Sequence, residues 1–153
     1  LKAERRDWPG AIDKYEKALA YVADLQAELE LKDQLVQALF AQANAEALRS
    51  QAEKIPERAK GAMKKAVALL KRSLRYRYQP ETLVRVAELY EKAGDLPEAI
   101  VWYRKAYDAN PGGISLKLSR MLEQQGKALL SDGKTEEANA LFAEAKKIAE
   151  MAK

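Results

Sequence analysis

Apolar residues recur at intervals of three and four positions along most of this chain. In residues 80–92 they include Leu83, Val86, Ala87 and Tyr90, with the charged residues Arg85 and Glu88 between them. Positions spaced in this way share one face of an α-helix. The pattern predicts a chain of amphipathic helices, each with one face turned toward a core.

One eight-residue pattern occurs four times: Ala, three residues, a large apolar residue, two residues and Ala. The copies are "AIDKYEKA" (11–18), "AKGAMKKA" (59–66), "AIVWYRKA" (99–106) and "ANALFAEA" (138–145). A proline lies just before the first three copies, and proline suits the first turn of a helix. These signals predict helices that begin near residues 8, 56, 96 and 134. Asp95 should cap the third of them, Ala106 should be buried between helices, and Ala109 should not.

The first two copies are unusually far apart. Ala11 and Ala59 are separated by 48 residues, against 40 and 39 for the next two intervals, and residues 11–55 contain no Gly or Pro. The apolar spacing predicts two antiparallel helices in this region, each lengthened by two turns, or about 10 Å. We expect the chain to reverse within the polar stretch "ELELKDQ" (28–34). The alternative is one continuous helix through residues 11–55.

Residues 80–113 carry the most complete unit: a helix, a turn at "AGD", a second helix and a stop at "NPGG". This unit resembles the tetratricopeptide repeat, a helix–turn–helix of 34 residues. The signature positions are matched by Leu83, Val86, Ala87, Tyr90, Gly94, Asp95, Ala99, Tyr103, Ala106 and Pro111. Residues 119–152 match more loosely, through Leu122, Gly126, Leu129, Gly133, Ala138, Phe142 and Ala145.

The resemblance implies an all-α fold, an α-solenoid of about four helix hairpins with the first incomplete. We expect one domain over residues 1–153, with a partial repeat at 1–30, a divergent long-helix repeat at 31–78, and repeats at 80–113 and 119–152. Such arrays present an extended concave surface, and in this family that surface binds a peptide, a helix or a partner domain. The resemblance therefore implies a protein-interaction scaffold, in a bacterial assembly or secretion system.

The resemblance also assigns residues to that groove. They are Glu81, Val84, Arg85, Glu88 and Lys92 on one helix, and Arg120, Glu123, Gln124 and Lys127 on another. A face of mixed charge suits a partner helix or folded surface with complementary charges. An alternative is a self-assembling scaffold, in which the overhanging hairpin at residues 11–55 or an uncapped end, such as the incomplete repeat at residues 1–30, docks on another copy.

The amino-acid composition limits the reactions and metal sites that the side chains can support. The 153 residues include neither Cys nor His, which removes thiolate metal sites, disulfides and the commonest general base. We expect no enzyme activity, cofactor or metal. "GKALLSDGKT" (126–135) has the wrong glycine spacing for a phosphate-binding loop, so Gly126 is expected to be a close helix contact and Gly133 a helix-ending turn.

No apolar run is long enough to cross a membrane. A soluble protein of the cytoplasm or the periplasm is expected, and because the chain begins at Leu1 without Met, it should be a segment of a longer protein.

Positive charge is concentrated between residues 54 and 78. This segment holds nine Lys or Arg residues and one acid, Glu57, which gives +8 in a chain whose net charge is +4. Its end, "KRSLRYRY", interleaves cations with Tyr: Lys71, Arg72, Arg75, Tyr76, Arg77 and Tyr78. The structural interpretation is that these cations favour a helix C-terminus and that Tyr76 and Tyr78 pack on the next repeat. The functional alternatives are a site for an acidic protein or lipid surface, or for nucleic acid.

Overall fold

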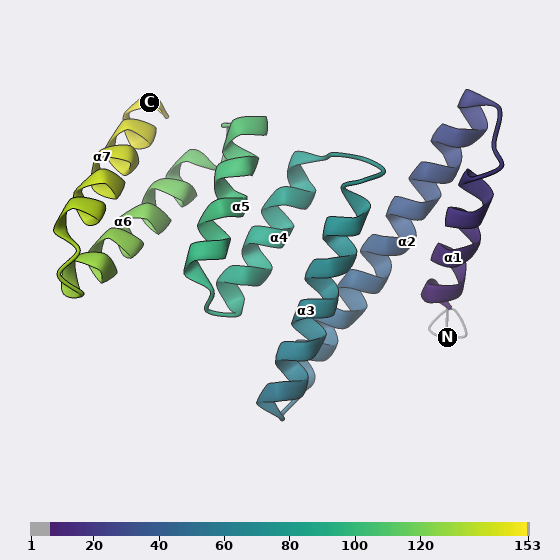
Figure 1. Ribbon diagram of the computed structural model, residues 1–153, viewed down its shortest axis with the longest axis horizontal. Helices are drawn as coiled ribbons and strands as arrows, with labels where there is room; N and C mark the ends of the chain where they lie inside the picture. The colour runs from purple at the N-terminus through teal and green to yellow at the C-terminus, as the bar shows by residue number, and fades with distance from the viewer. Residues whose placement is uncertain (1–6, 153) are drawn as a thin grey trace. The chain divides into compact units, whose positions relative to one another are not determined.

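The computed structural model describes residues 7–152, which form seven α-helices and no strand (Figure 1). The helices are α1 (Trp8–Leu19), α2 (Leu25–Ala52), α3 (Pro56–Ser73), α4 (Pro80–Lys92), α5 (Leu96–Ala109), α6 (Ser115–Ser131) and α7 (Thr135–Met151). The predicted all-α array of helix hairpins is confirmed: α1 precedes the hairpins α2–α3, α4–α5 and α6–α7. Residues 1–6 of the predicted partial repeat lie outside the described residues.

The chain divides into two compact units, Leu1–Gln79 and Pro80–Lys153. We call them the N-terminal unit and the C-terminal unit. The boundary coincides with the start of the most complete sequence repeat, at Pro80.

Helix starts are set locally, as the sequence predicts. Pro9, Pro56 and Pro97 all lie in the first turn of a helix. The carboxylate of Asp95 accepts a hydrogen bond from the backbone N–H of Glu98 at 3.3 Å, so the predicted cap of α5 is confirmed. Asp7 caps α1 in the same way, through the N–H of Gly10 at 2.9 Å. Such caps satisfy backbone donors that have no partner inside the helix.

The predicted reversal at residues 28–34 is wrong, and so is the single helix through residues 11–55. The chain turns at residues 20–24, and α2 then continues without interruption for 28 residues. Asp24 starts this helix by accepting a hydrogen bond from the N–H of Gln26 at 3.3 Å. The stretch at 28–34 stays helical because it consists largely of helix formers, and because Glu28 and Lys32 form an i,i+4 ion pair of 2.6 Å.

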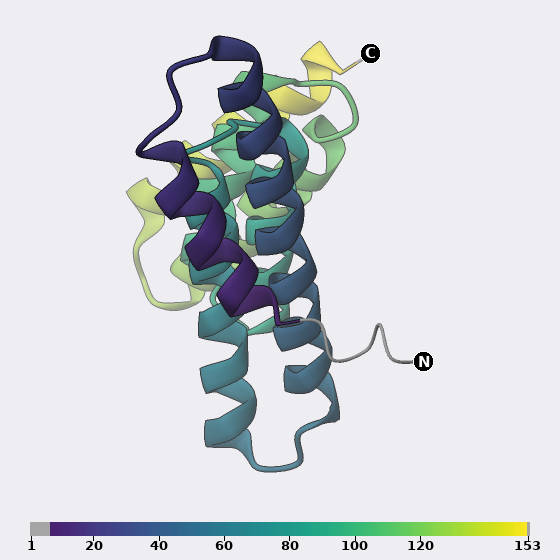
Figure 2. The same cartoon turned by 90° about the vertical axis from the view of Figure 1, so that its right-hand side faces the viewer.

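The core of the N-terminal unit lies where α1 crosses the first half of α2. Ile12, Leu35, Ala38 and Leu39 are buried there. Partly buried side chains of α1 and α3 and of the segment after α3 surround them: Trp8, Tyr15 and Leu19 of α1, Leu69 of α3, and Tyr76 just after α3. Beyond α1, the α2–α3 hairpin continues on its own to the loop at residues 53–55 (Figure 2). The prediction of two lengthened helices within residues 11–55 is therefore wrong: α1 has 12 residues, and the added length lies in α2, which has 28.

Small residues bring the helices of the C-terminal unit together. Ala106 is 1% exposed, whereas Ala109 is exposed, as the repeat register predicts. A Cβ placed on Gly126 would lie 2.6 Å from the ring of Phe142 in α7, so the predicted close contact at Gly126 is confirmed. Gly133 has φ +80° in the turn between α6 and α7, a conformation that favours glycine. The predicted helix-ending turn is therefore confirmed too.

Candidate functional site

The predicted groove residues of α4 share one side of that helix. Glu81 and Lys92 are exposed, and Val84, Arg85 and Glu88 are half-buried. They alternate along α4 with the fully buried residues Thr82, Leu83, Val86, Ala87 and Leu89. Arg85 pairs with Glu88 at 3.5 Å. Because this pair lies at the surface, it contributes little to stability and both groups can exchange partners.

The predicted groove residues of α6 are more open. Arg120, Glu123, Gln124 and Lys127 are all exposed and lie opposite the buried side of the helix, which includes Leu118 and Leu122. Within residues 7–152, none of these four side chains forms an ion pair or a hydrogen bond with another side chain. The face therefore offers both signs of charge and an amide without internal partners.

A hydrogen-bonded cluster that the sequence did not predict joins α4, α5 and α6. The hydroxyl of Tyr103 donates to Glu91 Oε1 at 2.8 Å, and Lys117 Nζ donates to Glu91 Oε2 at 2.8 Å. The ammonium of Lys117 also lies 5.9 Å from the centre of the Tyr103 ring. The cluster fixes the start of α6 against the hairpin α4–α5. Tyr103 was identified only as the large apolar residue of its repeat, and no local signal links Glu91 to Lys117.

Burial and hydrogen bonding shift the pKa values of this cluster. Burial alone would raise the pKa of Glu91, but the hydrogen bonds from Lys117 and Tyr103 outweigh it and leave that pKa below its usual value. Burial, together with the neighbouring Glu91 carboxylate, raises the pKa of Tyr103 well above its usual range. The carboxylate is therefore held in its charged form and the phenol in its neutral form.

The basic segment at residues 71–78 is partly neutralised within the N-terminal unit. Arg72 forms an ion pair with Glu16 of α1, and Arg77 forms one with Asp33 of α2. The hydroxyl of Tyr76 donates to Glu16 at 2.6 Å. Lys71 is half-buried, whereas Arg75 and Tyr78 are exposed. The structure thus places three of these six residues in contacts with α1 or α2. The tyrosines differ from the prediction: Tyr76 packs on the core formed by α1 and α2, which precede it in the chain, and Tyr78 is 63% exposed.

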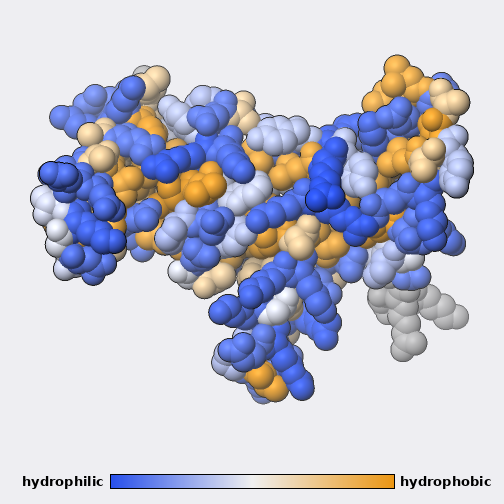
Figure 3. All heavy atoms as spheres, in the orientation of Figure 1, coloured by the Kyte–Doolittle hydropathy of each residue, from blue (hydrophilic) through white to orange (hydrophobic). Residues whose placement is uncertain are grey.

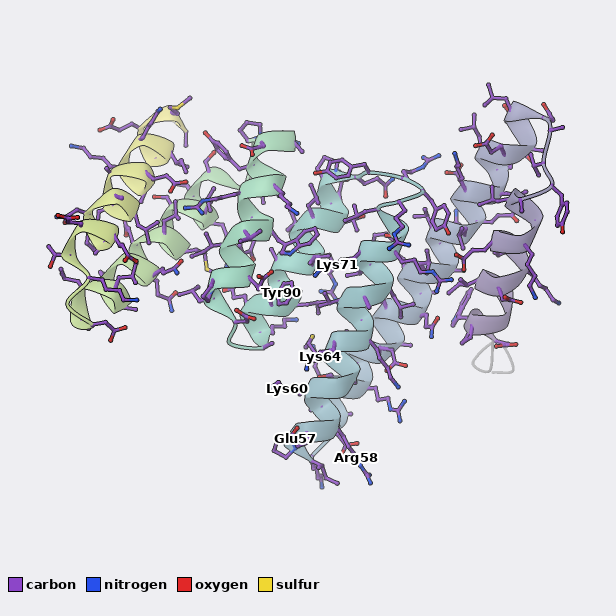
Figure 4. The ribbon with its side chains drawn as sticks, viewed as in Figure 1. Glu57, Arg58, Lys60, Lys64, Lys71 and Tyr90 are labelled. Carbon is purple, nitrogen blue, oxygen red and sulfur yellow. The ribbon has the colours of Figure 1, made fainter. Side chains whose placement is uncertain are left out.

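Another group of cations surrounds the end of the α2–α3 hairpin. We call it the hairpin-end cluster; it consists of Lys54, Arg58, Lys60, Lys64 and Lys65, all exposed. Among the described residues, none of the five has an acidic partner within ion-pair distance. Lys60 and Lys64 project from one edge of α3 and Arg58 from the opposite edge (Figure 4). The surface of this part of the hairpin is mostly hydrophilic (Figure 3).

Residues 7–152 contain no group of three or more acidic side chains placed to hold a metal ion. None of the helices described is both long enough and apolar enough to cross a membrane.

Consecutive helix hairpins with small residues at their contacts define a helical-repeat protein. Residues 78–151 match the family model "Tetratricopeptide repeat", and this part of the chain belongs to that family. A comparison with curated proteins finds no match. Among solved structures, the chain is similar to "Crystal structure of MamA protein" with 19% sequence identity and a TM-score of 0.44. That likeness covers 98% of this chain and 77% of the other.

The match to the tetratricopeptide repeat family indicates a general kind of function for residues 78–151. Tetratricopeptide repeats generally mediate protein–protein interactions, and they are typically non-catalytic scaffolds. The C-terminal unit is therefore a protein-interaction fold.

Proposed function

We propose that this protein is an interaction scaffold whose C-terminal unit binds a partner helix or folded domain through the exposed faces of α4 and α6. The observation that carries the proposal is the open, mixed-charge face of α6, with Arg120, Glu123, Gln124 and Lys127 unpaired among the described residues. The match of residues 78–151 to the tetratricopeptide repeat family supports the same function, because such repeats generally bind other proteins. A bacterial assembly or secretion system is the setting we propose for it.

The charges on the two helices decide which partner fits. Each helix carries acids and bases on the same side, Arg85 beside Glu88 on α4 and Glu123 beside Lys127 on α6. A uniformly charged ligand would meet repulsion from half of these groups. A partner surface with both signs in the complementary order would meet none, so electrostatics would set specificity and association rate more than affinity.

Site-specific photocrosslinking tests this proposal. A photoreactive amino acid at Val84 or Gln124 should crosslink a partner in a lysate of the source organism, whereas the same amino acid at the exposed Asn139 of α7 should not. Adding Arg85→Glu and Lys127→Glu together should reduce that crosslink by about tenfold, because each substitution replaces an attraction by a repulsion. Both groups lie at the surface, so helicity and melting temperature should change little.

The controls separate the groove from other surfaces. A Lys146→Glu and Lys147→Glu variant of α7 makes the same change in net charge at exposed positions. Equal crosslinking at Val84 and Asn139, or an equal loss in the two charge variants, would show that binding does not use the faces of α4 and α6.

Self-association is a second candidate, favoured by apolar side chains exposed near the start of α2. Tyr21 is 89% exposed, Leu25 69% and Leu29 42%. If this patch covers its counterpart on another copy, the average mass should rise with concentration. Leu25→Glu with Leu29→Glu should then keep the protein monomeric in sedimentation experiments. Leu130→Glu, at another exposed leucine in α6, should not. A wild-type chain that stays monomeric at high concentration would contradict this candidate.

A further inference from the structure

The hairpin-end cluster has a regular geometry on α3. Arg58 and Lys65 are seven residues apart and Lys60 and Lys64 are four apart, so each pair lies along one side of the helix. Between the two sides lie Gly61 and the exposed Ala68, again seven residues apart. A Cβ built on Gly61 meets no atom within 4 Å. The outer face of α3 is thus a strip of small residues bordered by cations.

Other cations of the N-terminal unit do have acidic partners. Lys17 pairs with Asp13 at 2.9 Å, Lys32 with Glu28 at 2.6 Å, and Arg72 with Glu16. The unit therefore neutralises some of its cations on α1, on the first half of α2 and at the end of α3. At the hairpin end the positive charges remain unbalanced in a small area, which raises the local potential and favours an anionic ligand.

We propose that the outer face of α3 binds an acidic helix of a partner protein. A helix can approach closely over Gly61 and Ala68, and carboxylates on its two flanks would then reach Lys64 on one side and Lys65 on the other. Charges that flank a close helix–helix contact set partner choice and orientation in this way in coiled coils. This surface is formed by residues of the N-terminal unit and the faces of α4 and α6 by residues of the C-terminal unit, so different substitutions test the two proposals.

The surroundings of the cluster favour a protein over a nucleic acid. Residues 41–75 contain no aromatic side chain on which a base could stack. Ile55, at the tip of the hairpin, is 46% exposed and adds an apolar contact that suits a protein surface.

A designed peptide tests the proposal. The probe is a fluorescein-labelled helical peptide about three heptads long, with Glu on both flanks of a stripe of Ala and Leu. Its control has the same composition in an order that spreads Glu around the helix. By fluorescence anisotropy, the first peptide should bind the full chain more tightly. Lys60→Glu, Lys64→Glu and Lys65→Glu together should weaken that binding by about tenfold or more, as expected when three ion pairs are replaced by repulsion.

Two further variants distinguish this site from general charge attraction. Lys134→Glu, Lys146→Glu and Lys147→Glu make the same change in net charge at exposed positions of the C-terminal unit and should leave binding nearly unchanged. Gly61→Leu adds bulk to the strip at a position where a Cβ meets no atom within 4 Å, and it should weaken binding although no charge changes. Circular dichroism should show unchanged helicity in each variant.

Several results would overturn the proposal. They are equal binding of the two peptides, equal losses in the two triple variants, and no effect of Gly61→Leu. Duplex DNA or phosphatidylserine vesicles that bind the cluster more tightly than the peptide would also do so, because they would assign it to nucleic acid or membrane.

Discussion

Tyr103→Ala is expected to lower the free energy of unfolding of the C-terminal unit by about 3–5 kcal/mol, the range for removing a buried aromatic ring. Tyr103 is 1% exposed and is the largest fully buried side chain of the described residues. The substitution leaves a cavity and removes the donor to Glu91 Oε1. Urea unfolding followed by Trp102 fluorescence, in a Trp8→Phe background, reports on this unit because the chain has only two tryptophans.

Tyr103→Phe separates the ring from its hydroxyl. It keeps the packing and should cost about 1 kcal/mol, the usual value of one hydrogen bond. If Phe and Ala destabilised the unit equally, the ring would not be packed as described.

The same cluster predicts a pH dependence. The pKa of Glu91 is lower in the folded chain than its usual value, so its contribution to stability is present above that usual value and is lost as pH falls through the folded pKa. The raised pKa of Tyr103 acts in the opposite direction: its contribution is present below the usual value for tyrosine and is lost at higher pH. Glu91→Gln should therefore reduce the loss of stability in acid.

Leu39→Ala should destabilise the N-terminal unit by about 2–5 kcal/mol, because it empties part of a close-packed core. Leu39 is fully buried beside Ile12, Leu35 and Ala38. Leu48→Ala is the matched control: it is the same substitution in the same helix, but Leu48 is 65% exposed and the change should stay within about 0.5 kcal/mol. Trp8, which packs on this core, reports the unfolding in a Trp102→Phe background.

Comparing the Leu39→Ala and Leu48→Ala variants tests where α1 packs. The core places Leu39 against α1, so Leu39→Ala should also release α1 and expose its amides to hydrogen exchange. Similar stability losses in the Leu39 and Leu48 variants would contradict the packing of α1 on the first half of α2.

By itself, the sequence determined the helices, most of their ends and the small residues at their contacts. Pro56 and Pro97 in first turns, the cap at Asp95 and the close contact at Gly126 were all predicted from neighbouring residues and from the repeat pattern. These features depend on interactions within about one helical turn, or on a periodicity that the sequence displays directly. The residues expected on the open side of α4 and α6 were assigned from the resemblance to the repeat family.

Only the tertiary structure decided the reversal at residues 20–24, the contacts of Arg72 and Tyr76 with Glu16, and the hydrogen-bonded cluster around Glu91. Residues 20–24 contain no Gly or Pro, so the turn there depends on how well α1 packs back on α2. Tyr76 and Glu16 are 60 residues apart, and Lys117 and Glu91 are 26 apart. Periodicity shows which residues face a neighbouring helix, but the pairing of charges across that contact depends on the distance and rotation between the helices, which packing sets.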